Sequence, residues 1–200
     1  QVGLVWRNEK PGPGRYREFI QIDADVVGTK NISVDADMCI LLADTLGKCG
    51  LDKDKYLIKV SNRKLIQGLL EDLKITNDSK KLTVIRAADK MDRVGISGVK
   101  ALLGKGRKDK SGDFTKGAGL KENQSEKIIS FLKMDNFSKL RNLSSNSIFK
   151  EGINELNEIF KLTKLSKFSD RIVFSPSVVR GIEYYTGAIF EANLLFKIKN

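Results

Sequence analysis

Residues 2–27 read VGLVWRNEKPGPGRYREFIQIDADVV. An apolar run, Val2–Trp6, is followed by a segment with two prolines and two glycines, and a second apolar stretch covers residues 16–27. Because proline and glycine interrupt strands and favour turns, the pattern predicts two antiparallel strands joined by a long loop. Asp23 and Asp25 alternate with apolar neighbours, a period of two that places both carboxylates on one face of the second strand.

The rest of the chain predicts an α+β core with a helical interruption. Apolar spacing and capping residues indicate helices beginning at Ser33 and at Ser61 or Asn62, and strands at residues 56–60, 171–174 and 188–196. Between these strands, beyond Thr76, every periodic segment has helical spacing. We therefore expect core segments at residues 1–75 and 171–200, separated by a basic, all-helical insertion at residues 76–170.

Composition excludes several kinds of chemistry. The chain has no histidine and two cysteines, so Ser-His-Asp and Cys-His catalysis, an HExxH zinc site and a histidine general base are excluded. Cys39 and Cys49 form no CxxC pair, so we expect neither a metal site nor a disulfide framework, and a reducing cytoplasm is the expected location. No apolar run approaches the roughly twenty residues that a membrane span needs.

Positive charge is concentrated in the middle of the chain. The whole sequence has 36 basic and 25 acidic side chains, a net charge of +11, and residues 76–170 account for eight of these charges. The densest stretch is Lys100–Lys121, where lysines lie among glycines. Such a run is typical of a solvated loop, and it also favours acidic partners such as phosphate or nucleic acid.

The loop of the first hairpin is suited to a polyphosphate. Three arginines flank it, namely Arg7, Arg15 and Arg17, and guanidinium forks match phosphate oxygens. Glu9 could accept a hydrogen bond from an exocyclic amine, and Phe19 could stack on a purine. The alternative is a hairpin whose charges pair across the strands and whose Phe19 belongs to the core.

Two strings together resemble a known family. Arg7-Asn8-Glu9, a loop, and then residues 15–21, RYREFIQ, resemble motif 2 of the class II aminoacyl-tRNA synthetases. Residues 180–187, RGIEYYTG, resemble the signature peptide of the histidyl-tRNA synthetase family, usually RGLDYYTG, with departures at Ile182 and Glu183. The resemblance covers essentially the whole chain and implies part of an antiparallel-sheet class II core interrupted by an insertion domain.

The resemblance also implies roles for individual residues. For ATP it assigns Arg7 to the α-phosphate, Glu9 to the adenine amino group, Arg15 to the γ-phosphate and Phe19 to stacking on adenine. For L-histidine it assigns Gln21, Asp25, Tyr184, Tyr185 and Arg180, the last of which also holds the α-phosphate. Arg7 and Arg180 would be the catalytic residues, and Mg²⁺ is expected to enter with ATP. Asp25 is one methylene shorter than the glutamate of many members.

In this family the insertion domain lies against the acceptor stem of the tRNA. That implies tRNA(His) as a partner and an RNA-facing role for the basic stretch, for which scattered cations suffice. The candidate RNA contacts are Lys100, Lys105, Arg107, Lys108, Lys110 and Lys116. A homodimer is the expected state of the parent protein.

The chain matches only part of the family pattern. No counterpart of motif 1, of motif 3 or of the anticodon-binding domain is found, so we expect a fragment that does not aminoacylate by itself. A histidyl-synthetase-like regulatory paralogue of the kind that serves ATP phosphoribosyltransferase is one alternative. An RNA-binding module without catalysis is another.

Overall fold

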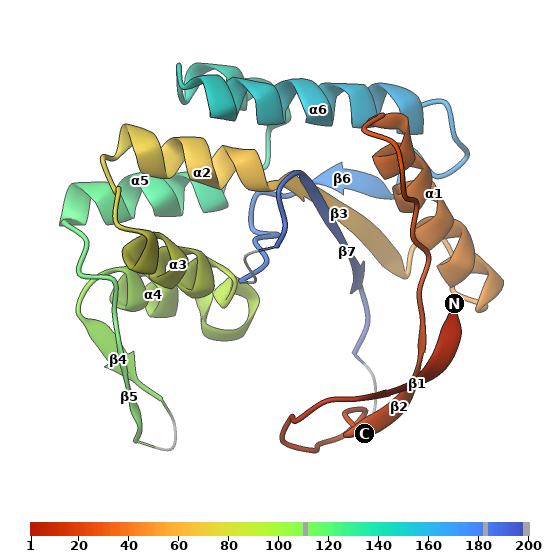
Figure 1. Cartoon of the computed structure of the whole chain (residues 1–200), viewed down its shortest axis with the longest axis horizontal. Helices are drawn as coiled ribbons and strands as arrows, with labels where there is room; N and C mark the ends of the chain where they lie inside the picture. The colour runs from red at the N-terminus through yellow and green to blue at the C-terminus, as the bar shows by residue number, and fades with distance from the viewer. Residues whose placement is uncertain (110–111, 182–183, 198–200) are drawn as a thin grey trace.

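The structure is a computed structural model that describes residues 1–109, 112–181 and 184–197 (Figure 1). In chain order the elements are β1 (Val2–Trp6), β2 (Glu18–Ile22), α1 (Ser33–Lys48), β3 (Tyr56–Asn62), α2 (Arg63–Asp72), α3 (Asp78–Ala88), α4 (Met91–Leu103), β4 (Gly106–Lys108), β5 (Phe114–Lys116), α5 (Glu122–Leu132), the 3-10 helix η1 (Phe137–Asn142), α6 (Ser147–Thr163), β6 (Ile172–Phe174) and β7 (Ala188–Leu194). Helices and mostly antiparallel strands are mixed along the chain, which confirms the α+β class.

A three-stranded sheet in the order β6-β3-β7 forms the centre of the core. The middle strand, β3, runs parallel to β6 and antiparallel to β7. Its alternate side chains Tyr56, Ile58 and Val60 are fully buried, which is typical of a strand paired on both edges and covered by helices. Because β6 comes from beyond the insertion, the sheet joins the two core segments predicted from the sequence.

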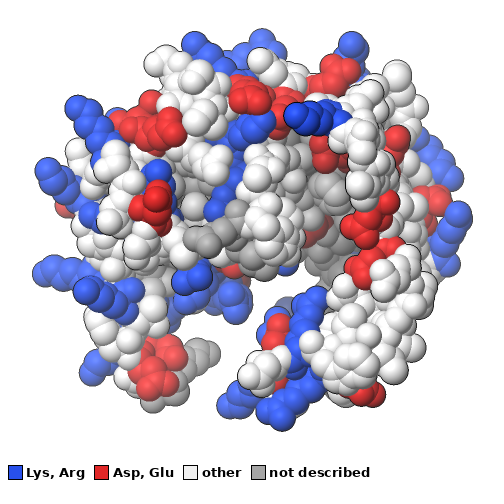
Figure 2. Space-filling model, in the orientation of Figure 1, with Lys and Arg blue, Asp and Glu red and all other residues white. Residues whose placement is uncertain are grey.

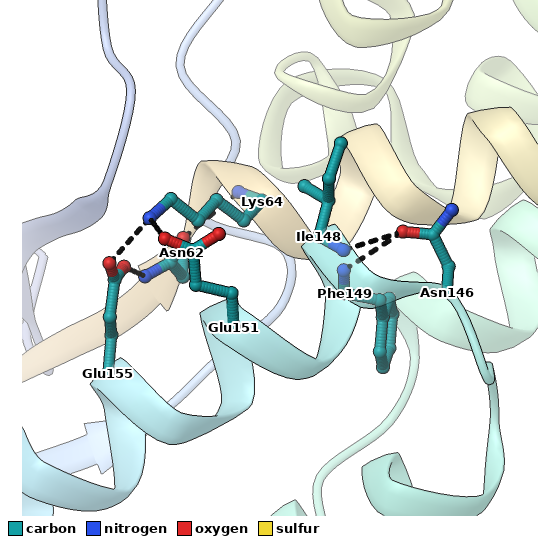
Figure 3. A network of polar contacts seen from close by, with 7 residues as sticks. All are labelled: Asn62, Lys64, Asn146, Ile148, Phe149, Glu151 and Glu155. Carbon is teal, nitrogen blue, oxygen red and sulfur yellow. Dashed lines mark hydrogen bonds and ion pairs between the residues drawn. The ribbon is translucent and has the colours of Figure 1, made fainter.

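Helices α1 and α6 pack on this sheet, and α2 packs along α6 (Figure 1). Helix α2 begins where β3 ends, and Asn62 caps it by accepting a hydrogen bond from the backbone N–H of Lys64 at 2.9 Å, which confirms the predicted cap. Asn146 caps α6 through the N–H groups of Ile148 and Phe149 (Figure 3). The two helices run antiparallel, because Nδ2 of Asn62 donates to Oε2 of Glu155 at 2.6 Å at one end and Nδ2 of Asn146 donates to Oε2 of Glu71 at 2.8 Å at the other.

The expectation of an all-helical insertion needs one correction. Helices α3, α4 and α5 pack together, but β4 and β5 form a two-stranded antiparallel ribbon between α4 and α5. Each strand has three residues, too few for a period of two to be recognised. Gly106 permits the pairing, since a Cβ there would lie 2.3 Å from the carbonyl oxygen of Thr115.

The domain boundaries at residues 75 and 170 remain predictions. Helix α6 lies inside the expected insertion, yet it packs on α1, α2 and β3. Its buried residues recur every three or four positions, as Phe149, Ile153 and Leu156 do, and this stripe faces the core. The contacts of α6 therefore favour an earlier return of the chain from the insertion to the core.

The N-terminal strands β1 and β2 form the predicted antiparallel hairpin as a separate two-stranded sheet. The second strand is shorter than expected: its register ends with Ile22 opposite Val2, and one further pair of hydrogen bonds joins Gln1 to Asp23. No helix in the part of the chain that the structure describes is long and apolar enough to cross a membrane.

Candidate active site

One face of the hairpin brings together three residues of the predicted site. Strand pairing aligns Val5 with Phe19, and the backbone N–H of Arg7 donates to the carbonyl of Arg17 at 2.8 Å. Nη2 of Arg7 donates a hydrogen bond to Oε1 of Gln21 at 3.0 Å, and Cζ of Arg7 lies 5.2 Å from the centre of the Phe19 ring. A predicted phosphate ligand and a predicted histidine ligand are therefore in direct contact.

The contact between Arg7 and Phe19 also constrains any purine that stacks there. A guanidinium over an aromatic ring is a cation–π pair worth about 0.5–1 kcal/mol at an exposed site. A purine would have to stack on the other side of the Phe19 ring or displace Arg7. The free energy needed to displace Arg7 is small compared with that gained from the contacts of a bound nucleotide.

Asp23 is a further member of this face that the sequence did not single out as a ligand. Nε2 of Gln21 donates to Oδ1 of Asp23 at 2.7 Å, so the amide oxygen of Gln21 points to Arg7 and its nitrogen to Asp23. The signal was the period-two spacing of residues 21 and 23. Asp25, the predicted imidazole contact, lies beyond the end of β2 and is exposed.

The loop between the strands is held by contacts among its predicted ATP ligands. Nη1 of Arg15 lies 3.6 Å from Oε2 of Glu9, and Nε of Arg17 donates to the backbone carbonyl of Glu9 at 3.3 Å. Both side chains of the Arg15–Glu9 pair are well exposed, so the pair is worth no more than about 1 kcal/mol. It can open at little cost, which leaves both groups available to a ligand.

The second group of predicted residues lies where β6 connects to β7. Nη1 of Arg180 lies 3.8 Å from Oε2 of Glu191 on β7. The rings of Tyr184 and Tyr185 are 4.7 Å apart, and the Tyr184 side chain is exposed. Burial, followed by the hydrogen bond with Tyr184, raises the pKa of Tyr185 and outweighs the opposing effect of Arg180. Tyr185 is therefore neutral at physiological pH. Residues 182 and 183 lie outside the described residues.

The structure does not join these two groups. Within residues 1–109, 112–181 and 184–197, no hydrogen bond or ion pair links the hairpin to the sheet of β6, β3 and β7 or to Arg180, and the hairpin lies apart from that sheet (Figure 1). The face opposite Phe19 and Gln21 is apolar and exposed, with Trp6 at 67% and Ile22 at 76% exposure. A hairpin with an uncovered apolar face and two unpaired edges is not held in place by its own contacts.

The predicted RNA contacts fall into different environments. Lys100 lies 3.2 Å from Glu122 and 3.7 Å from Glu126 in exposed ion pairs, so two carboxylates flank its charge. Lys105 is exposed in the turn after α4. Arg107 is half-buried, and its Nη1 would lie 3.2 Å from a Cβ at Gly98. Lys110 lies outside the described residues.

Lys108 and Lys116 lie on one face of the β4–β5 ribbon together with Phe114. The register pairs Lys108 with Phe114 and Gly106 with Lys116, which places all four residues on the same face. Both lysines are exposed, and Phe114 is 60% exposed. An exposed aromatic ring between cations is a combination that suits nucleic acid, because the ring can stack on a base while the cations meet phosphates.

Three further cations line hollows beside this ribbon. Arg86 and Lys90 line a hollow of about 190 Å³ together with Lys116, and Lys90 and Arg93 line a second of about 210 Å³ together with Arg107. Arg86 lies in α3, Lys90 directly before α4 and Arg93 in the first turn of α4, all outside the stretch Lys100–Lys121 that the sequence indicates. Figure 2 shows Lys and Arg side chains gathered over the insertion and at the tip of the β1–β2 hairpin.

This cationic surface adjoins the segment that holds Arg180. A Cβ at Gly181 would lie 3.2 Å from Oδ2 of Asp89 and 3.5 Å from Cγ of Arg86, so the end of α3 packs against Gly181. In the described part of the chain, no group of three or more Cys, Asp or Glu side chains is arranged to hold a metal ion.

Comparisons with known proteins identify the family of the chain. The family profile of histidyl-tRNA synthetase matches residues 2–194. The histidine--tRNA ligase of Bartonella bacilliformis is 47% identical over 208 aligned positions, which cover 99% of this chain and 42% of that protein. The histidine--tRNA ligase of Rhizobium meliloti is 46% identical and is likewise 42% covered. The chain thus spans less than half the length of the curated relatives it matches.

Solved structures show the same fold. The histidyl-tRNA synthetase of Nostoc sp. PCC 7120 superposes with a TM-score of 0.77 at 24% identity, covering 98% of this chain and 43% of that one. An ATP phosphoribosyltransferase regulatory subunit/histidyl-tRNA synthetase from Bacillus halodurans C superposes with a TM-score of 0.73 at 18% identity, covering 97% and 47%. Because the family profile matches residues 2–194 of its 200 residues, the chain belongs to the histidyl-tRNA synthetase family.

Proposed function

We propose that the protein containing this chain is a histidine--tRNA ligase, which activates L-histidine with ATP and transfers it to tRNA(His). The observation that carries the proposal is the hydrogen bond between Arg7 and Gln21. The family resemblance assigns Arg7 to the α-phosphate of ATP and Gln21 to the amino acid, and this hydrogen bond joins the two residues. A site for adenylate formation needs this adjacency, because the bond that forms joins those two substrates.

The proposed chemistry fits a chain without histidine. An oxygen of the histidine carboxylate attacks the α-phosphorus of ATP, an O–P bond forms, and pyrophosphate leaves with its Mg²⁺. A terminal ribose hydroxyl of the tRNA then attacks the carbonyl carbon of the histidyl-adenylate, its proton passes to the phosphate, and AMP leaves. The first step brings two anions together, so fixed cations such as Arg7 and Arg180 lower the barrier by positioning and electrostatics, and a carboxylate needs no general base.

Recognition of the imidazole is proposed to rest on Asp25, Tyr184 and Tyr185. A carboxylate that accepts the imidazole N–H, with aromatic walls, discriminates strongly against isosteres, because an analogue without that N–H leaves the carboxylate unpaired. Arg7 follows β1, and Arg180 lies between β6 and β7. We propose that the two arginines face the same adenylate in the full-length protein, which is proposed to be a cytoplasmic homodimer.

For the tRNA we propose an enlarged surface. It consists of Lys105, Lys108, Lys116 and Phe114 on and beside the ribbon, together with Arg86, Lys90 and Arg93. Its support is the position of Arg86, which lines the hollow beside the ribbon and also lies, together with Asp89, against Gly181. An acceptor end following that surface would reach the segment of Arg180. RNA duplexes are read mostly through phosphates and 2′-hydroxyls, for which such cations are suited.

A regulatory role is the second candidate, since the Bacillus halodurans protein shares the fold. We favour the ligase because Arg7, Glu9 and Arg180 are all present, and a protein that only senses histidine has no use for phosphate ligands. The cationic surface is equally unexplained by a sensor.

The test is histidine-dependent exchange of pyrophosphate into ATP by the full-length parent. Arg180→Ala is expected to lower the exchange rate about a hundredfold, the effect of losing one fixed charge at a developing anion. Arg141→Ala, which removes an exposed arginine of η1, is the matched control and should leave the rate unchanged. An Arg180→Ala protein with the wild-type rate would contradict the assignment, and an inactive wild type would favour the regulatory candidate.

A further inference from the structure

Both ends of the segment 180–187, here called the signature segment, are held by one residue. The backbone N–H of Arg63 donates to the carbonyl of Gly187 at 2.8 Å. Nη1 of the same arginine donates to the carbonyl of Arg180 at 2.7 Å. We propose that Arg63 is a positioning residue, which acts through Arg180 by holding the start of the signature segment against its end.

Arg63 itself has a rigid base. It is the first residue of α2, directly after β3, and the Asn62 side chain caps the helix at this point. Asn62 pairs with Ala188, so the sheet fixes the return of the signature segment to β7. The sheet thus holds the Gly187 end independently of the Arg63 side chain, whereas the contact at the Arg180 end comes from the guanidinium.

Burial gives this contact its strength. Arg63 is only 4% exposed, and a charged donor in a buried site binds a carbonyl more tightly than a neutral donor does. Removing the guanidinium leaves the Arg180 carbonyl to find another donor, so the backbone at Arg180 is expected to rotate. A shift of about 1 Å in a residue that positions reacting groups can lower a rate about a hundredfold.

A purely structural role must be separated from this one. Arg63 also lines a hollow between α2 and α3 with Leu70 and Ile85, so its loss could loosen the packing of the insertion. The next residue, Lys64, is a suitable control. Its Nζ lies 2.6 Å from Glu151 and 2.5 Å from Glu155 of α6 (Figure 3), and no described contact joins its side chain to the signature segment.

The experiment rests on the proposed function and uses the full-length ligase in histidine-dependent pyrophosphate exchange. Arg63→Met is expected to lower kcat/KM for histidine about 10- to 100-fold. Lys64→Met should lower the melting temperature while keeping kcat/KM within about twofold of wild type. Arg63→Lys, which retains a cationic donor, should recover part of the lost activity.

The decisive readout is a double-mutant cycle with Arg180→Ala. If Arg63 acts through Arg180, Arg63→Met should have little further effect on kcat/KM in the Arg180→Ala background, whereas a packing defect would lower the rate equally in both backgrounds. Equal losses, or an Arg63→Met protein as active as Lys64→Met, would overturn the inference. If Arg63→Met does not fold, the same cycle is run with Arg63→Lys. A wild type that catalyses no exchange would instead overturn the proposed function, and with it the role of Arg63.

Discussion

Replacing Gly68 by alanine is expected to destabilise this chain, although alanine is the better helix former. Gly68 lies in α2 against the first turn of α6. A Cβ at this position would lie 2.7 Å from Cβ and 2.8 Å from the backbone N of Phe149, and 2.9 Å from Oδ1 of Asn146. The two Phe149 atoms cannot swing aside as the end of a flexible side chain could. Helix α6 would have to move, and the movement would disturb the Asn146 cap.

Two effects of opposite sign decide the magnitude. Alanine in place of glycine inside a helix contributes up to about 1 kcal/mol. Overpacking against a fixed backbone costs about 1–3 kcal/mol, and approaches of 2.7 and 2.8 Å to Phe149 favour the upper part of that range. After the gain from alanine, the free energy of unfolding is expected to fall by about 1–2 kcal/mol. For a chain of this size, that corresponds to a melting temperature lower by about 2–8 °C.

Gly47 provides a matched control within the same chain. It also lies in a helix, α1, but a Cβ there would meet only Oη of Tyr56 at 3.7 Å, an ordinary contact. Gly47→Ala is therefore expected to raise the free energy of unfolding by up to about 1 kcal/mol. Both variants would be measured by urea denaturation followed by circular dichroism, with the slope compared to detect changes in cooperativity. If Gly68→Ala stabilised the chain as Gly47→Ala does, the reasoning about the α2–α6 contact would be refuted.

Two further predictions concern the ribbon and the cysteines. Replacing both Lys108 and Lys116 by alanine should weaken tRNA binding by the parent, and the slope of log K against log salt should fall by the equivalent of about two phosphate contacts. Lys100→Ala should change binding less, because Glu122 and Glu126 of α5 flank that lysine. Equal effects of the two changes in titrations at several salt concentrations would argue against the assignment. Burial raises the pKa of the Cys39 thiol to about 12. At neutral pH the folded chain should therefore react with a disulfide reagent at the exposed Cys49 alone, and Cys39 should react only on unfolding. Rapid reaction of two thiols in the native chain would disprove the burial argument.

The long periodic elements of the fold could be predicted from the sequence. Helix α1, the cap at Asn62 and the strands of the core follow from apolar spacing and from residue types that favour one conformation. The β4–β5 ribbon could not be predicted, because three-residue strands carry no periodic signal. Its formation depends instead on the close approach of Gly106 to Thr115, which is visible only when both strands are placed.

Candidate ligands were easier to identify than the residues that support them. Phe19 and Gln21 are two residues apart on one face of β2, and Arg7 directly follows the paired strand β1. The contact among the three residues therefore follows from the pairing of the strands. The period-two spacing places Asp23 on the face of Gln21, but its hydrogen bond to the Gln21 amide is visible only in the structure. The proposed role of Arg63 depends on hydrogen bonds to backbone carbonyls, which have no sequence signature. Arg86, Lys90 and Arg93 likewise join the basic surface only because α3 and α4 fold beside the ribbon.

The separation of Arg7 from Arg180 has a physical origin in the hairpin itself. A period of two divides its side chains between two faces, so the face that carries Phe19 and Gln21 is necessarily opposed by the apolar face of Trp6 and Ile22. If another part of the full-length protein packed on the apolar face, it would also position the opposite face, because both faces belong to the same two strands. Within the described residues nothing packs on it closely enough to bury it. We therefore expect the geometry between the two arginines in the full-length protein to depend on what covers Trp6 and Ile22, and we expect changes on that apolar face to lower histidine-dependent pyrophosphate exchange by the parent.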